Sequence, residues 1–374
     1  MPMSLLLSIY CVLWFACGVQ QSCSLSQWQP DAFRSPAELA HSKGYPVEEH
    51  VTVTEDGYVL SLQRVPRGRR QLPGAFSGPP VLLVHGLLSS AAVWVINYPH
   101  QSLGFLLADA GYDVWLGNYR GTPFSRGHLE FSDRDSRYWD FGLDEVGLLD
   151  LPALVDYVLA NTGWPQLFLV GFSQGSAAAW AMLADKPEYN DKASAAAVNQ
   201  GRLLVRPQWL RRATYALCES PLRYVCALPT FFLFGVNLNQ LNQSRLPVYT
   251  SQLPSGASKR NVEQFAQIIR ARNFVKYNYG PLRNLYHYGT VDSPAYDLSK
   301  ITAPVALFSS HNDFFANPED VSTLRQSLPN VVLDYIVPDL DFTHLDFILG
   351  TEAAAFVYKP LIDFMNYWVL LYGP

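Results

Sequence analysis

Short apolar segments alternate with helical segments along most of this chain, and this alternation constrains its fold more than any other feature. Apolar runs at 80–84, 112–116 and 166–170 have the length and composition of strands that are covered on both faces. Apolar residues at helical spacing follow at 103–110 and 144–161. Strands alternating with helices predict an α/β fold, a mostly parallel, doubly wound sheet.

Segments before and after this middle region predict further parts of the sheet. Two β-rich runs at 51–54 and 58–62, separated by a turn sequence, predict a hairpin at the start of the sheet. Later segments of the same kind predict two more strands and a closing helix, at 305–308, 331–337 and 353–371.

An aromatic and basic segment at 201–290 interrupts the alternation. A chain of 374 residues exceeds the size at which one simple core stops growing, so an insertion or a second domain is expected. We interpret 201–290 as a helical cap inserted between two parts of one core, at 19–200 and 291–374. The alternative is a second structural domain without a role in catalysis.

Composition excludes several functional classes. The chain is 49% hydrophobic, 14% aromatic and 16% charged, which is typical of an ordered globular protein. Its formal net charge of -5 offers no basic field to a polyanion. We therefore expect no nucleic-acid partner.

The first residues have the layout of a signal peptide, at 1–18. An apolar run from Leu5 to about Cys17 follows a short start and precedes Gly18 and a polar stretch. The run is shorter than the roughly 20 residues that a spanning helix needs, so a mature chain without a transmembrane segment is predicted. Because the start carries no Lys or Arg, a retained membrane anchor remains the alternative.

Five cysteines are present, and Cys11 and Cys17 would leave with the signal peptide. Cys218 and Cys226 are close enough in sequence to close a small loop in an oxidising compartment, which would leave Cys23 without a partner. The alternative is that all three are unpaired, because spacing does not establish the geometry of a disulfide.

Two short patterns bear on metals and modification. Cys and His pairs lack the close spacing of zinc ligands, so we expect no metal. The sequon Asn242-Gln243-Ser244 predicts glycosylation of Asn242 at the surface.

The most informative motif is Gly171-Phe172-Ser173-Gln174-Gly175, which follows the strand at 166–170 and precedes a helix of small residues at 176–184. A strand, a tight turn and a helix in this order would lift the hydroxyl of Ser173 above the sheet in a strained conformation. Ser173 is therefore the candidate nucleophile. The alternative is an ordinary glycine-rich turn between a strand and a helix.

A serine nucleophile needs a base and a carboxylate, which this fold supplies on loops after late strands, in the order Ser, acid, His. Asp313 and His344 follow the strands at 305–308 and 331–337 and are our candidates. Among the other histidines, His311 is the serious rival, since most of the rest lie outside such loops: His41, His50, His100, His128 and His287. The rival acids are Asp334, Asp341 and Asp346.

Backbone N–H groups must be aimed at the oxyanion before its charge develops. Gln174 would supply one amide, from the residue after the nucleophile. The turn Val84-His85-Gly86-Leu87-Leu88 follows an early strand and nominates the amide of Leu87 as the second.

Taken together, the motifs resemble one family, the acid lipases that include the gastric and lysosomal lipases. The resemblance covers nearly the whole mature chain. It rests on GYPVEEH at 44–50, TEDGY at 54–58, HGL at 85–87, NYRG at 118–121, WDF at 139–141, DE at 144–145, DLPA at 150–153, LNQSR at 241–245, ND at 312–313, ANPEDV at 316–321 and HLDF at 344–347.

The resemblance implies an α/β-hydrolase fold, a Ser173, Asp313 and His344 triad, oxyanion amides at Leu87 and Gln174, and a cap disulfide between Cys218 and Cys226. It implies hydrolysis of acylglycerols or sterol esters without a cofactor, at a lipid–water interface, by a secreted or lysosomal protein. Two features depart from the family: Phe172 stands where a histidine is usual, and the stretch at 185–218 is shorter. The rival functions are a carboxylesterase for small soluble esters and a lipid-binding protein without turnover.

Overall fold

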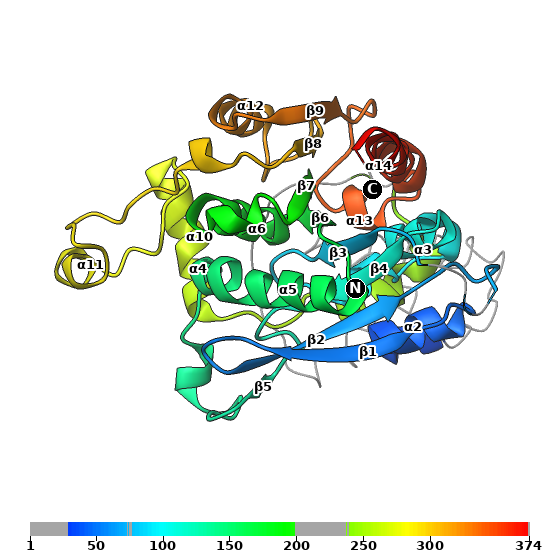
Figure 1. Cartoon of the computed structure of the whole chain (residues 1–374), viewed down its shortest axis with the longest axis horizontal. Coiled ribbons are helices and arrows are strands. Elements are labelled where there is room, and N and C mark those ends of the chain that lie inside the picture. Colours follow the sequence, from blue (N-terminus) through cyan, green and yellow to red (C-terminus); the bar gives the residue numbers. More distant parts are fainter. Residues whose placement is uncertain (1–28, 73, 75–76, 199–236, 238, 373–374) are drawn as a thin grey trace, which may run out of the picture. The chain divides into compact units, whose positions relative to one another are not determined.

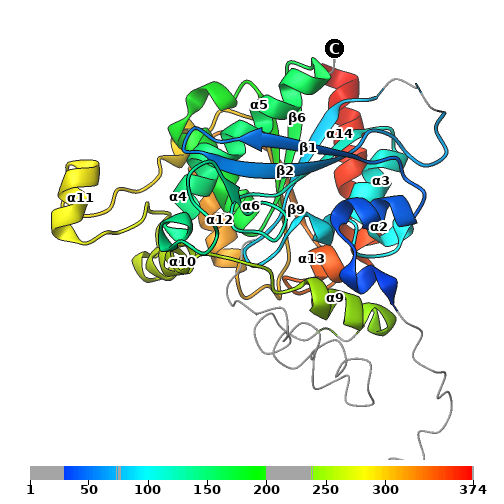
Figure 2. The ribbon, with the colours of Figure 1, turned by 90° about the horizontal axis from the view of Figure 1, so that it is seen from below.

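A mostly parallel sheet forms the core of the fold in a computed structural model of the chain (Figures 1 and 2). The structure describes residues 29–72, 74, 77–198, 237 and 239–372. The chain divides into two units, Met1–Pro30 and Asp31–Pro374, and the fold described below is that of the second unit. The expected signal peptide and all five cysteines lie outside the described residues.

Nine strands make up the sheet in the described part of the chain. Their order is β1-β2-β4-β3-β6-β7-β8-β9, with β5 paired to β2. The pairs from β4 to β9 are parallel, whereas β2 pairs antiparallel with β1, β4 and β5. The bounds are β1 Glu48–Val53, β2 Tyr58–Val65, β3 Pro80–Val84, β4 Asp113–Gly117, β5 Gly127–His128, β6 Leu167–Phe172, β7 Ala193–Val198, β8 Val305–Ser309 and β9 Val331–Ile336.

Helices cover both faces of the sheet, as a doubly wound α/β fold requires (Figure 1). Alternate residues of β3 pack into the two hydrophobic cores on opposite faces of the sheet. Val81 and Leu83 pack with α3 and α14, and Leu82 and Val84 pack with α5 and α6. The prediction of continuous apolar strands buried on both faces is thus confirmed. The helices are α2 Pro36–Ser42, α3 Leu103–Asp109, α4 Leu143–Glu145, α5 Leu151–Thr162, α6 Gln174–Asp185, α9 Leu246–Gln252, α10 Lys259–Ala271, α11 Pro281–Tyr288, α12 Pro318–Ser327, α13 Asp346–Leu349 and α14 Lys359–Tyr372.

The predicted helix at 144–161 is not one regular helix, because a π-helical turn at Val146–Asp150 separates α4 from α5. Pro152 lacks the N–H that a regular α-helical turn would use here, which favours the wider i→i+5 hydrogen-bond spacing of a π-helix. Gly147 lets this turn pack closely on α6: a Cβ atom at Gly147 would lie 2.8 Å from the Cβ atom of Ala181. The irregular turn therefore fixes the distance to the helix that begins after Ser173.

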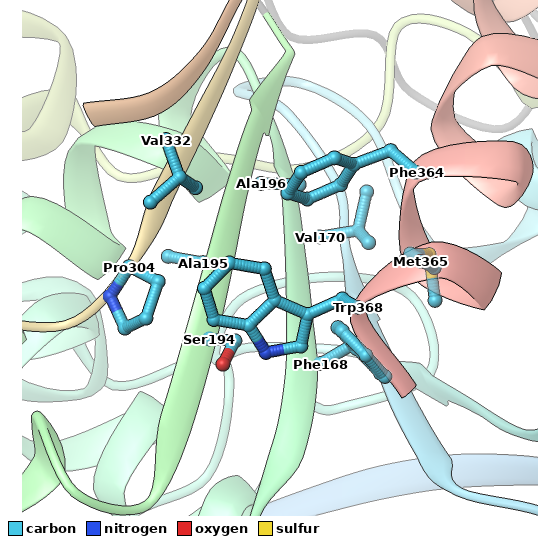
Figure 3. A pocket seen from close by; sticks show the side chains of 10 residues that line it. All are labelled: Phe168, Val170, Ser194, Ala195, Ala196, Pro304, Val332, Phe364, Met365 and Trp368. Atoms are coloured by element: carbon cyan, nitrogen blue, oxygen red, sulfur yellow. The ribbon is translucent and has the colours of Figure 1, made fainter. Parts of the chain in front are cut away.

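Strand β7 was not predicted, since its sequence is mostly alanine, which is poor in strands. Its pairing with β6 and β8 decides its conformation instead. The short side chains leave space that α14 fills with Phe364 and Trp368, and a gap of about 10 Å³ remains beside Ala195 and Ala196 (Figure 3). A gap of that size, lined almost wholly by apolar groups, holds at most one water and marks no ligand site.

Three helices of the described chain, α9, α10 and α11, belong to the segment at 201–290 that we interpret as a cap. Residues 201–236 and 238 lie outside the described part. Helix α10 approaches α4, where the side chain of Gln264 accepts a hydrogen bond from the N–H of Leu143 at 2.8 Å. No helix in the described residues is long and apolar enough to cross a bilayer.

Candidate active site

Ser173 lies between the end of β6 and the start of α6, with φ 58° and ψ -118°. This left-handed φ is unfavourable for any residue with a side chain, so the surrounding packing must hold it. Two glycines make that packing possible. A Cβ atom at Gly171 would lie 2.6 Å from the N atom of Ser176, and one at Gly175 would lie 2.3 Å from the O atom of Val84. The strained turn that the motif predicts is therefore present.

His344 and Asp313 are paired, although they are far apart in sequence. The Nδ1 atom of His344 lies 3.0 Å from Oδ2 of Asp313, and each residue is 1% exposed. The other carboxylate oxygen, Oδ1, accepts hydrogen bonds from the N–H groups of Phe315 at 2.8 Å and Ala316 at 3.1 Å. Because a carboxylate only accepts, Nδ1 of His344 carries the proton and Nε2 is the basic nitrogen.

Phe172 packs against the loop after β9, which carries His344. The centroid of its ring lies 4.9 Å from that of the His344 ring. Phe315, on the loop after β8 that carries Asp313, contacts the same imidazole with its ring centroid at 5.2 Å. Phe172 directly precedes Ser173 in the chain, so the ends of β6, β8 and β9 converge at one place. An aromatic residue at position 172 thus supports the imidazole through packing.

The turn after β3 also approaches Ser173. A Cβ atom at Gly86 would lie 2.8 Å from the Cβ atom of Ser173, so only glycine allows this approach. Leu87 follows directly and is half-buried. Gln174 begins α6, where its N–H has no acceptor within the helix, and its side-chain oxygen accepts a hydrogen bond from Nδ2 of Asn261 on α10 at 3.1 Å. Both candidate oxyanion amides belong to segments that adjoin Ser173.

The rival residues are placed differently. His311 and Asp341 are exposed, and Asp334 pairs with Arg325 at 2.8 Å. Asp346 begins α13, two residues after His344, and its Oδ2 accepts hydrogen bonds from the N–H of Thr343 at 2.6 Å and from Oγ1 of Thr343 at 2.8 Å. The remaining histidines lie on other elements or turns: His41 on α2, His50 on β1, His85 after β3, His100 before α3, His128 on β5 and His287 on α11.

From the sequence, Asp346 was considered only as a rival acid, and its contact with Thr343, beside His344, was not predicted. The residues Thr343-His344-Leu345-Asp346 have the spacing of a capping box, which was the available signal. Burial raises the pKa of Asp346 to about 6. Asp346 thus holds Thr343, the residue directly before His344.

Within the described residues, no group of three or more His, Cys, Asp and Glu side chains is arranged to hold a metal ion. The Asn242 sequon is ordered: the side-chain oxygen of Asn242 accepts a hydrogen bond from Oγ of Ser244 at 2.7 Å. Ser244 is exposed and Asn242 is half-buried.

Comparison with known proteins agrees with this geometry. Residues 79–350 match a family model described as the alpha/beta hydrolase fold, and residues 36–98 match one described as a partial alpha/beta-hydrolase lipase region. Lipase 3 of Drosophila melanogaster is 37% identical over 88% of this chain and 92% of its own length. Gastric triacylglycerol lipase of Bos taurus is 34% identical over 90% of this chain and 92% of its own.

Solved structures show the same fold. A crystallised protein of Sulfolobus solfataricus, 14% identical, matches 86% of this chain and 94% of its own with a TM-score of 0.57. The predicted α/β-hydrolase fold and the resemblance to acid lipases are both confirmed. The chain belongs to the α/β-hydrolase lipases, the family that contains the gastric triacylglycerol lipases.

Proposed function

We propose that this chain is a secreted, serine-dependent lipase that hydrolyses carboxylic esters of lipids, either triacylglycerols or sterol esters, through an acyl-enzyme. One observation carries the proposal: the buried hydrogen bond between Asp313 and His344 lies beside the strained turn that bears Ser173. The names of the relatives, Lipase 3 and gastric triacylglycerol lipase, support lipid esters as the substrate class.

In the acylation step, Oγ of Ser173 attacks the acyl carbonyl while Nε2 of His344 takes its proton. Asp313 stabilises the imidazolium that forms and keeps the ring in the required tautomer. The carbonyl oxygen becomes an oxyanion, which accepts hydrogen bonds from the N–H groups of Leu87 and Gln174. The intermediate then collapses, and His344 gives its proton to the departing alcohol.

Deacylation repeats these steps with water. His344 takes a proton from the water, whose oxygen attacks the acyl-enzyme carbonyl. A second oxyanion forms in the same place. Its collapse breaks the bond to Oγ of Ser173, returns the proton to that oxygen and releases the fatty acid. The reaction is balanced by water alone, and no cofactor takes part.

The domain organisation is part of the proposal. A core from 19–200 and 291–374 carries the catalytic residues, and 201–290 forms a cap above them. The approach of α10 to Gln174 supports a cap that borders the site. We further propose a signal peptide at 1–18, a Cys218–Cys226 disulfide in the cap, glycosylation of Asn242 and a secreted or lysosomal destination.

Ser173→Ala tests the mechanism. We expect activity on a soluble p-nitrophenyl ester to fall by at least about 10³-fold with an unchanged unfolding temperature. In the wild type, a fluorophosphonate probe should add to the peptide that contains Ser173. Retention of most activity by the folded variant would falsify the acyl-enzyme route, and the absence of an adduct on the wild type would favour a lipid-binding protein.

A separate measurement distinguishes a lipase from a carboxylesterase for small soluble esters. Tributyrin is hydrolysed at concentrations below and above its solubility limit. A lipase gains rate when the emulsion forms, because its substrate gathers at the interface. A rate that is already saturated below the solubility limit would instead identify a soluble-ester carboxylesterase.

A further inference from the structure

Tyr119 makes a buried contact with the turn that carries Leu87. It lies two residues after β4 and is 2% exposed. Its hydroxyl donates a hydrogen bond to the carbonyl oxygen of Gly86 at 2.6 Å. Its ring stacks on that of His85, with centroids 4.0 Å apart. The steps proposed above for Ser173, Asp313 and His344 do not use Tyr119.

His85 makes a second hydrogen bond to the same carbonyl. Its Nδ1 atom lies 2.9 Å from the O atom of Gly86. Burial lowers the pKa of His85 to about 3, so the ring is neutral and its Nδ1 proton points at the carbonyl. Burial also raises the pKa of Tyr119 well above its usual range, which keeps the hydroxyl a donor. The carbonyl oxygen of Gly86 therefore accepts two hydrogen bonds, from Tyr119 and from His85.

We propose that Tyr119 is a positioning residue for the oxyanion site: its hydroxyl fixes the Gly86–Leu87 peptide so that the N–H of Leu87 faces the reacting carbonyl. The C=O and N–H bonds of a trans peptide are rigidly coplanar and point in opposite directions. A carbonyl held by Tyr119 and His85 consequently sets the direction of the Leu87 N–H. The close approach of Gly86 to Ser173 places this peptide at the nucleophile.

This role rests on the proposed function of the Leu87 amide and goes one step beyond it. A donor stabilises the oxyanion only if it is aimed before the charge develops. Without Tyr119, the peptide would be held by His85 alone and would rotate more freely. The loss should then appear in the transition state and hardly in the binding of the ester.

Tyr119→Phe removes only the hydroxyl and keeps the ring that stacks on His85. We expect kcat for a soluble p-nitrophenyl ester to fall about tenfold with KM within about twofold, a smaller loss than the roughly 10²–10³-fold cost of deleting an oxyanion donor. Rates are normalised to sites titrated with a fluorophosphonate, so that unfolded protein does not count. The affinity of a trifluoromethyl ketone, which forms an oxyanion on Ser173, should fall by a similar factor.

Tyr138→Phe is the matched control. Tyr138 is also fully buried, and its hydroxyl donates to the carbonyl oxygen of Ser125 at 2.9 Å. This variant should lower the unfolding temperature and leave kcat and ketone affinity per titrated site within about twofold. If Tyr119→Phe behaves like the control, Tyr119 has only a structural role and the proposal is overturned. If the wild type itself forms no adduct with the ketone, the proposed esterase function fails instead.

Discussion

Asp346 illustrates, at the scale of a residue, how a buried carboxyl group couples stability to pH. Burial raises its pKa from an ordinary 3.8 to about 6. The folded state therefore disfavours the ionised form, so the contribution of this group to stability is complete below about pH 3.8 and is lost as the pH rises through 6. The side chain of Asp346→Asn stays neutral at every pH and keeps an oxygen that can accept hydrogen bonds from Thr343. From pH 4 to pH 7, the free energy of unfolding of the variant should gain about 2 kcal/mol relative to the wild type.

Denaturant unfolding at both pH values measures this difference, and Asp341→Asn, an exposed substitution in the loop between β9 and α13, provides the control. A difference between Asp346→Asn and the wild type that is equal at the two pH values would contradict the prediction. Asp346 also shows what sequence reasoning finds least easily. Ser173, Asp313 and His344 follow from residue types at strand ends, whereas the role of Asp346 depends on its burial and on the hydrogen bonds that it accepts from Thr343.

At the scale of elements, the π-helical turn at Val146–Asp150 predicts a specific coupling. In Gly147→Ala, the new methyl group would lie 2.8 Å from Cβ of Ala181 and 2.9 Å from O of Ala178. Overpacking of this kind costs about 1–3 kcal/mol of stability. Adding Ala181→Gly removes one of the two contacts, so the double variant should be more stable than the sum of the single effects by about 1 kcal/mol. Denaturant unfolding of all four proteins gives the coupling free energy, and strictly additive effects would show that α6 moves away freely.

The same scale explains which elements could be predicted. Strands β3, β4, β6 and β8 bury nearly every side chain, so their apolar runs identify them. Strand β7 has no such signal, because alanine has a low preference for strands and only the neighbours on both sides impose its conformation. Local composition therefore predicted the strands that have strong propensities and missed β7 and the two-residue β5, which depend on tertiary pairing.

At the scale of the whole molecule, the order of the strands in the sheet could not be predicted from local sequence patterns. The sequence predicts an α/β sheet, but the position of β3 between β4 and β6 results from contacts among segments that are distant in the chain. The convergence of Asp313 and His344 was predictable only because the order of catalytic residues along this fold is known. Motif order thus supplied the long-range information that propensities lack.

An ion cluster around the buried Arg120 joins the end of β4, the π-helical turn and the turn between β1 and β2, and it provides the last prediction. Arg120, which follows β4, is 1% exposed. It donates from Nε to Oδ1 of Asp150 at 2.8 Å and from Nη1 to Oδ2 of Asp56 at 2.7 Å. Asp150 ends the π-helical turn, and Asp56 lies in the turn between β1 and β2. Arg120→Met would leave the Asp150 carboxylate buried without its cation, which typically costs about 3–5 kcal/mol.

Denaturant unfolding measures this loss, and the pair formed by the exposed Arg137 and the half-buried Asp135 supplies the control. Arg137→Met should leave the midpoint of unfolding unchanged, because water reaches the charged groups of both Arg137 and Asp135. Combining Arg120→Met with Asp150→Asn should recover part of the lost stability, since the second substitution removes the uncompensated charge. If the double variant is less stable than Arg120→Met alone, the hydrogen bond that the N–H of Arg120 donates to Oδ2 of Asp150, at 2.9 Å, matters more than the charge pair.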